Sequence, residues 1–206
     1  MRRHPDLRRS LRLRHGQTFA WRPAAPVDAA MIWTWWTRPD LTYWGTAPRL
    51  GRIGPPPYDA GTVRQYLELP PERLGVTPLV GALDGTPVAY AETYAKGDSP
   101  LASVPVIEDS ARGSHLLVDP VARVDRRIVF EIVVDGVDWS FETWPEADHY
   151  IGDPDVRNRS MLHLHSMLGM RQVAVVELPH KTASLVAISR ADWSARREQL
   201  AAVIRR

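Results

Sequence analysis

Strand-like and helix-like hydrophobic patterns alternate along most of the chain. Apolar residues that alternate with polar ones, or form short β-branched runs, predict strands over residues 18–22, 78–83, 88–94, 113–118, 147–151, 171–178 and 182–189. Apolar residues at helical spacing predict one helix that opens at 26–28 and two more over 60–69 and 161–168. The pair Asp84-Gly85, between two of these strands, is typical of a hairpin turn. The pattern predicts an α/β or α+β fold.

The stretch 124–139 fits two patterns. Apolar residues at 128, 129, 132, 133 and 137 follow a helical stripe, whereas the β-branched content of 128–134 suits a strand. The period and the length of the stretch favour a helix. Gly and Pro interrupt 51–57 and 96–109, which are expected to be loops.

Length and charge indicate one domain with a basic start. A chain of 206 residues with 44% hydrophobic content is long enough to bury one sizeable core, which we expect over residues 17–206. The formal charge is only +2, yet seven arginines fall within the first 22 residues, namely Arg2, Arg3, Arg8, Arg9, Arg12, Arg14 and Arg22. We expect residues 1–16 to form a mobile, solvated arm. Binding to an anionic surface or a nucleic acid is the alternative, although 1–16 contain no Phe, Trp or Tyr to stack on bases.

The chain contains no cysteine, which excludes a disulfide framework, a thiol nucleophile and a cysteine-based zinc site. No run of 18 or more apolar residues is present, and no apolar segment follows the arginine-rich start. A cytoplasmic protein with neither a membrane nor a nucleic acid as partner is therefore expected. An arginine-rich, acid-poor start also suits a transit peptide.

Six pieces of sequence, in a fixed order, resemble a known enzyme family. They are Trp36-Thr-Arg-Pro39 followed by Trp44, Pro78-Leu-Val-Gly-Ala-Leu-Asp-Gly-Thr-Pro87, Ala89-Tyr-Ala-Glu-Thr-Tyr94, Arg112-Gly-Ser-His-Leu-Leu-Val118, Asp153-Pro-Asp-Val-Arg-Asn158 and Pro179-His-Lys-Thr-Ala-Ser-Leu185. Together they resemble the Gcn5-related N-acyltransferases (GNAT), and within them the lysine or hydroxylysine N-acyltransferases of siderophore biosynthesis. The resemblance covers about residues 17–190. The related aminoglycoside 6′-N-acetyltransferases share the general pattern.

This resemblance implies the GNAT fold, a central mixed and mostly antiparallel sheet flanked by helices. It also implies transfer of an acyl group from acetyl-CoA or another acyl-CoA, or from an acyl carrier protein, without a metal. The acceptor would be an amine or hydroxylamine of a small lysine-like or polyamine-like molecule. The protein would be a monomer or a homodimer.

The resemblance places the catalytic pair at His115 and Asp155. An amine must lose a proton to attack a thioester, and a histidine titrates nearest to neutral pH. A carboxylate beside it would orient the imidazole or hold a cationic acceptor. The alternatives are a histidine satisfied within the core, and a helix-capping role for Asp155.

The acceptor side would include Glu92, Tyr94, His180 and Lys181. Glu92 and Tyr94 share one face of their strand with Tyr90, because side chains alternate along a strand. The resemblance implies that Glu92 holds a substrate ammonium and that His180 and Lys181 lie beside the acceptor. A sheet edge facing solvent and a solvated turn are the alternatives.

The donor side would include Leu117, Val118 and Asn158, the last with helix capping as an alternative. In the family a glycine-rich turn lets backbone amides surround the coenzyme A pyrophosphate at a helix N-terminus. The corresponding stretch, 121–127, has no glycine, and it contains Asp125. Its three arginines, Arg123, Arg126 and Arg127, either bind the phosphates instead or are ordinary solvated charges. This departure leaves open a related protein that has lost acyl transfer and acts as an accessory or binding protein, or runs a different reaction in the same cleft.

Overall fold

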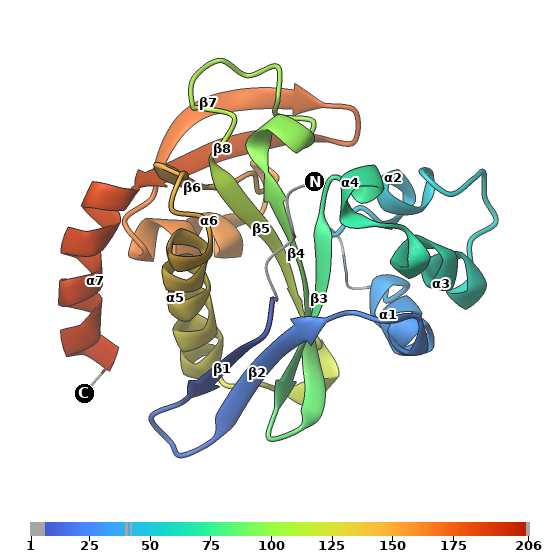
Figure 1. The fold of residues 1–206 in the computed structure, drawn as a ribbon, viewed down its shortest axis with the longest axis horizontal. Coiled ribbons are helices and arrows are strands. Elements are labelled where there is room, and N and C mark those ends of the chain that lie inside the picture. The colour runs from blue at the N-terminus through green and yellow to red at the C-terminus, as the bar shows by residue number, and fades with distance from the viewer. Residues whose placement is uncertain (1–6, 40, 42, 205–206) are drawn as a thin grey trace.

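Eight strands form a single sheet in the computed structural model, which describes residues 7–39, 41 and 43–204 (Figure 1). The strands are β1 (Arg9–Arg12), β2 (Thr18–Pro23), β3 (Thr77–Leu83), β4 (Thr86–Ala95), β5 (Arg112–Val118), β6 (His149–Gly152), β7 (Arg171–Leu178) and β8 (Lys181–Ser189). Their order is β1-β2-β3-β4-β5-β6-β8-β7. All neighbouring pairs are antiparallel except β5 and β6. The expected mixed, mostly antiparallel sheet is confirmed.

Helices cover both faces of this sheet. They are α1 (Ala29–Trp36), α2 (Thr46–Leu50), α3 (Ala60–Glu68), α4 (Pro71–Leu74), α5 (Arg126–Thr143), α6 (Arg159–Met167) and α7 (Arg190–Ile204), with short 3-10 turns at η1 (Pro26–Asp28), η2 (Lys96–Asp98) and η3 (Pro120–Ala122). Figure 1 shows α1–α4 on one side of the sheet and α5–α7 on the other. None of the helices in the described part of the chain is long and apolar enough to cross a membrane.

The strands β5 and β6 separate soon after they meet. Their parallel ladder joins only Arg112 to Tyr150 and Gly113 to Ile151. Because a parallel pair needs a crossover, the chain passes through α5 between them. From Ser114 onwards β5 pairs with β4 alone among the described strands, so the sheet opens here on the β6 side.

Most of the predicted elements are confirmed, including the helix within 124–139. Asp125 caps α5, since its side chain accepts a hydrogen bond from the backbone N–H of Arg127. The hairpin between β3 and β4 turns at Asp84 and Gly85, both with positive φ, as its two-residue turn requires. The helices α2, α4 and α7 were not predicted, and 190–204 form a helix after the last strand.

The expectation of a mobile arm is wrong for the residues from Leu7 onwards, while 1–6 lie outside the described part. The strand β1 pairs with β2, and Leu7 and Leu13 at either end of it are each only 2% exposed. Arginines of this segment form ion pairs with a row of acidic residues on α5. Arg9 binds Asp135 at 2.7 Å and Glu142 at 2.5 Å.

The same row of acids has two further partners. Arg14 binds Glu131 at 2.9 Å, and Arg197 of α7 binds Asp138 at 2.6 Å. The four acids are spaced by three or four residues, so they share one face of α5. Charge complementarity across this face joins the first strand and the last helix to α5.

Replacing Arg9 by Ala is expected to lower the free energy of unfolding by about 1–3 kcal/mol, because the buried Asp135 loses its partner. Urea unfolding measures the change. Arg12→Ala is the matched control, since Arg12 is exposed and its side chain bonds only to Thr18 in the described contacts. Equal stability of the two variants would show that β1 is held by strand pairing and apolar packing alone.

Candidate active site

The register of β4 and β5 brings Glu92 opposite His115. Both side chains therefore lie on the same face of the sheet, together with Tyr90 and Tyr94, as the alternation predicted. His115 Nδ1 is 3.3 Å from Glu92 Oε2. The predicted residues on these two strands thus meet around one imidazole.

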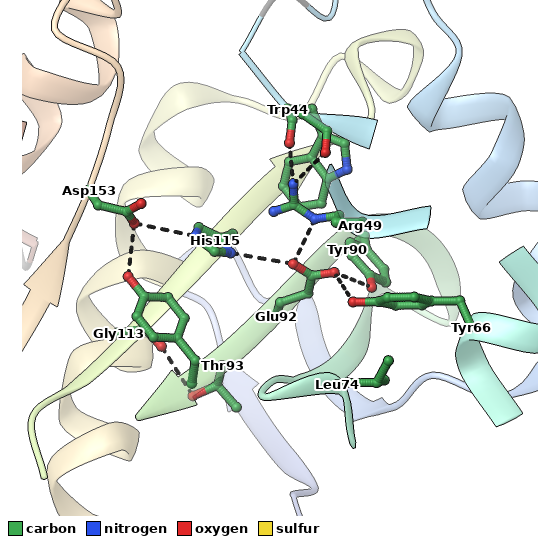
Figure 2. A network of polar contacts seen from close by, with 12 residues as sticks. Trp44, Arg49, Tyr66, Leu74, Tyr90, Glu92, Thr93, Gly113, His115 and Asp153 are labelled. Carbon is green, nitrogen blue, oxygen red and sulfur yellow. Dashed lines mark hydrogen bonds and ion pairs between the residues drawn. The ribbon is translucent and has the colours of Figure 1, made fainter. Parts of the chain in front are cut away.

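Asp153 supplies a second carboxylate to the same ring. It follows directly after β6, where β6 separates from β5, and its Oδ1 lies 3.3 Å from His115 Nε2. Tyr94 donates to that oxygen at 2.9 Å, and its ring stacks on His115 with centroids 4.9 Å apart. Figure 2 shows the imidazole between Glu92 and Asp153. Each ring nitrogen of His115 faces one carboxylate.

Glu92 is held as a buried anion. Its side chain is only 1% exposed, and Arg49 donates from Nε to Oε2 at 2.8 Å. The hydroxyls of Tyr66 and Tyr90 donate to Oε1 at 2.8 and 3.0 Å. Burial alone would raise the pKa of Glu92, but the charge of Arg49 and the contact with His115 lower this pKa to about 2. Glu92 is therefore ionised throughout the physiological range.

Arg49 is fixed from several sides. Its guanidinium donates to the backbone carbonyls of Trp44 and Gly45 and lies 4.1 Å above the Trp44 ring. These contacts use the planar, multi-donor geometry of arginine. Arg49 thereby ties α2 to Glu92 on β4.

Lys181 holds Asp153 in a similar way. Its Nζ is 2.8 Å from Asp153 Oδ2 and also donates to the Asp153 backbone carbonyl. Burial alone would raise the pKa of Asp153, but the charges of His115 and Lys181 and their hydrogen bonds keep this pKa well below its usual range. Asp153 is therefore a second permanent anion beside His115.

These anions control the titration of His115. Burial would lower the pKa of the imidazole, but the charge of Asp153 and the hydrogen bonds to Asp153 and Glu92 raise it above the ordinary value. The side chain remains 28% exposed. His115 is thus a proton-exchanging group with an open side.

The open side of His115 faces a cavity of about 670 Å³. Both Ser114 and His115 line it, although neighbouring residues of a strand point to opposite faces of the sheet. The cavity therefore reaches both faces where β5 and β6 separate. In the described part of the chain, no group of three or more His, Cys, Asp or Glu residues is placed to hold a metal ion.

The predicted acceptor residues line this cavity, but several are already engaged. Glu92 is bound by Arg49 and two tyrosines, so its carboxylate already has a charged partner and two hydrogen-bond donors. Tyr94 and Lys181 bind Asp153. His180 is exposed within the lining, and its pKa is lowered by burial and by the charges of Lys181 and Arg49.

The structure pairs His115 with Asp153 in place of the predicted Asp155. The Asp155 carboxylate is turned toward Arg157, whose Nη2 lies 2.7 Å away and whose backbone N–H donates to it at 2.8 Å. The side-chain hydrogen bond from Arg157 lowers the pKa of Asp155 to about 2. Its backbone forms a bridge with Ala183, on the β8 side. Asp155 still lines the cavity, but its described partner is Arg157.

The predicted donor residues are divided. Asn158 lines the cavity and also caps α6, accepting a hydrogen bond from the Met161 backbone. Leu117 is buried in the core beside α1–α4. Leu117 is not part of the described lining of the cavity, and neither are Val118, Arg123, Arg126 and Arg127. These three arginines are exposed. The helix N-terminus expected to bind phosphate is capped by Asp125 instead.

Sequence reasoning missed Asp153, Arg49 and Tyr66 as site residues. Asp153 is the first residue of the Asp153–Asn158 motif. It follows a strand that is parallel to β5, and this position is the signal that would have identified it as a site residue. Arg49 follows no hydrophobic period, because it lies in a short helix before a Gly- and Pro-rich loop. Tyr66 lies on the predicted helix α3, but its contact with Glu92 is a tertiary one.

A family model described as an acetyltransferase (GNAT) domain matches residues 25–178. An uncharacterized protein from Bacillus halodurans has a similar structure, with a TM-score of 0.79 and 20% identity over 93% of this chain and 95% of the other. Aminoglycoside acetyltransferase AAC(6')-Ib in complex with coenzyme A gives a TM-score of 0.70 and 23% identity, over 87% and 99% of the two chains. An aminoglycoside N(6')acetyltransferase from Legionella pneumophila gives 0.60 and 10%, over 88% and 95%. Among curated proteins, none matches.

Asp153→Asn is expected to lower the pKa of His115, because it removes the charge that most favours the imidazolium. An NMR titration of the imidazole measures this. Since folding raises the pKa, protonated His115 stabilises the fold fully below its unfolded pKa, and this contribution is lost as pH rises through the folded pKa. Asp155→Asn is the control, and an equal shift in both variants would contradict the pairing with Asp153.

Proposed function

The chain belongs to the GNAT acetyltransferase family, and from that premise we propose that it transfers an acyl group from acyl-coenzyme A to the nitrogen of a small amine or hydroxylamine. The observation that carries the proposal is His115, which opens onto the cavity while two ionised carboxylates hold its ring. The placement of the cavity at the separation of β5 and β6 also supports it, since a donor and an acceptor can then approach from opposite faces.

His115 acts as the general base in this proposal. Glu92 accepts a hydrogen bond from Nδ1–H and so selects the tautomer with its lone pair on Nε2. Because Nε2 also faces Asp153, the acceptor nitrogen must displace this contact to reach it. As the acceptor nitrogen attacks the thioester carbon, Nε2 takes its proton, a C–N bond forms, and the C–S bond breaks to release the thiol. Asp153 orients the imidazole and stabilises its cation. Direct transfer is expected because the chain has no cysteine for an acyl-enzyme.

The donor is expected to bind along the opening between β5 and β6. Backbone groups of β5 that face this opening lack a strand partner among the described residues, so they are free to bond amide groups of an extended ligand. Exposed Arg123, Arg126 and Arg127 lie at the start of α5, where they can neutralise phosphates. An acyl carrier protein, whose prosthetic arm has the same amides, is the alternative donor.

The charges of the lining favour a lysine-like acceptor of the siderophore type. Arg49, Arg52 and Lys181 oppose four carboxylates, and Glu92, Asp153 and Asp155 are already ion-paired. A polycation finds few free carboxylates in such a cavity, whereas a molecule with a single reactive nitrogen needs fewer of them.

An aminoglycoside acceptor is the second candidate. It is supported by the fold shared with aminoglycoside acetyltransferases, one of which is described in complex with coenzyme A and kanamycin. The two candidates differ in the number of positive charges on the acceptor, so turnover with lysine, hydroxylysine-type hydroxylamines and kanamycin separates them.

With the preferred acceptor, His115→Ala is expected to lower kcat by roughly 100-fold or more, as loss of a general base does. Thiol release measures turnover. The wild-type rate should rise with pH as the imidazole loses its proton, with a midpoint above the ordinary value of about 6.5. His115→Gln controls for packing, and unimpaired turnover in both variants would remove His115 from the mechanism.

Asp125→Ser is expected to tighten coenzyme A binding by about two- to fivefold, because it keeps a helix cap and removes a negative charge near the phosphates. Calorimetric titration measures the dissociation constant. Glu68→Gln makes the same charge change on α3, across the sheet. Equal affinities in the three proteins would place the phosphates away from the α5 N-terminus, and failure of the wild type to bind would favour a carrier-protein donor or a non-transferase protein.

A further inference from the structure

The side of α5 that faces the sheet contains a gap between two parts of the core. Ile128 and Ile132 pack in one apolar cluster, and Val137 and Phe141 pack in another. The small residues Gly136 and Ser140 lie on adjacent turns of α5, between the parts of the helix that contact these two clusters. Val133 and Trp144 lie beside them. All four line the cavity that also contains His115.

Open space lies in front of the two small residues. A Cβ atom added to Gly136 would meet no described atom within 4 Å. Ser140 is 5% exposed, and its Oγ has no hydrogen-bond partner within the part of the chain that the structure describes. Glycine within a helix and an unfilled cavity both destabilise a fold. This region therefore keeps a space open at a cost in stability, which indicates a ligand.

Across this space from α5 lies the face of the sheet that points away from the His115 side chain. Leu116 and Ser114 flank His115 on β5 and point away from it, toward α5. Trp21, Trp139 and Tyr150 also line the space. None of these lining residues is charged, and the nearest described charge is Arg112, which lies over the Trp144 ring from the same face of β5. We name it the α5 pocket, bounded by Trp21, Leu116, Gly136, Trp139, Ser140 and Tyr150.

We propose that the α5 pocket binds the acyl chain of the donor, and that this chain is a medium-length alkyl chain rather than the methyl group of acetyl. The inference rests on the proposed function. The reacting carbonyl carbon must lie near His115, with the acceptor on that face and the thiol arm leaving along the opening between β5 and β6. The third substituent of that carbon, the acyl chain, then extends through the opening into the α5 pocket.

The chemistry of the pocket sets the preference for chain length. Apolar surface removed from water contributes about a fourfold gain in affinity for each buried methylene. Acetyl reaches none of this surface. An octanoyl chain has six more carbons, of which even part buried in the pocket yields a gain of about 30-fold or more. A charged chain would lose its hydration there, and the unpartnered Ser140 Oγ offers it only one neutral hydrogen bond.

Calorimetric titration of the wild-type protein with coenzyme A, acetyl-, butyryl-, octanoyl- and dodecanoyl-coenzyme A tests the proposal without an acceptor. We expect acetyl-coenzyme A to bind about as well as coenzyme A, and octanoyl-coenzyme A to bind at least about 30-fold more tightly. Equal affinity for the acetyl and octanoyl forms would overturn the acyl-chain inference while leaving the transferase intact. Failure of every thioester and of coenzyme A to bind would overturn both.

Filling the pocket provides the matched test. Gly136→Leu places a side chain in the open space, so octanoyl affinity should fall to the acetyl level while acetyl affinity stays unchanged. Gly136→Ala is the control, since it occupies little of the space and favours the helix. If Gly136→Leu lowers the unfolding temperature, Ser140→Leu fills the same space from the next turn. Equal weakening of acetyl and octanoyl binding in a folded variant would contradict the proposal.

Discussion

The buried carboxylate of Glu92 is the group on which the site depends. An ionised side chain that is 1% exposed is tolerated only when it is paired and fully hydrogen-bonded. Its partners come from α2, α3, β4 and β5, so one charge connects helices on one face of the sheet to two central strands. Removing any partner leaves this charge underpaired, which makes the positions of Arg49 and His115 interdependent.

Two opposed effects meet at His115. The carboxylates on both sides orient the ring and stabilise its cation, yet a general base must begin the reaction as the neutral imidazole. The raised pKa makes the imidazole a stronger base while reducing the fraction that is neutral at a given pH. Arg49 moderates this effect, because its positive charge beside Glu92 lowers the pKa of His115. In the proposed mechanism, the paired arginine is therefore part of how the site tunes its base.

Features that follow from the local spacing of residues were predicted from the sequence. Features that depend on contacts between distant parts of the chain were not. The helix α5, the hairpin at Asp84 and Gly85, and the shared face of Tyr90 and Glu92 follow from spacing alone. The strand β1 resembled a solvated arm because the acids that bind its arginines lie more than 100 residues away. The choice of Asp153 over Asp155 depends on where β5 and β6 separate, which no local pattern shows.

The same opening relates the unusual donor loop to the space beneath α5. With Asp125 at the helix N-terminus and no glycine in the loop, the proposed phosphate site consists of exposed arginine side chains rather than a cradle of backbone amides. Exposed charge pairs contribute little and weaken with salt, whereas burial of an alkyl chain does not. A donor recognised at its acyl end relies less on phosphate contacts. Weak phosphate binding at the glycine-free loop and stronger binding of the acyl chain beside Gly136 and Ser140 then complement each other.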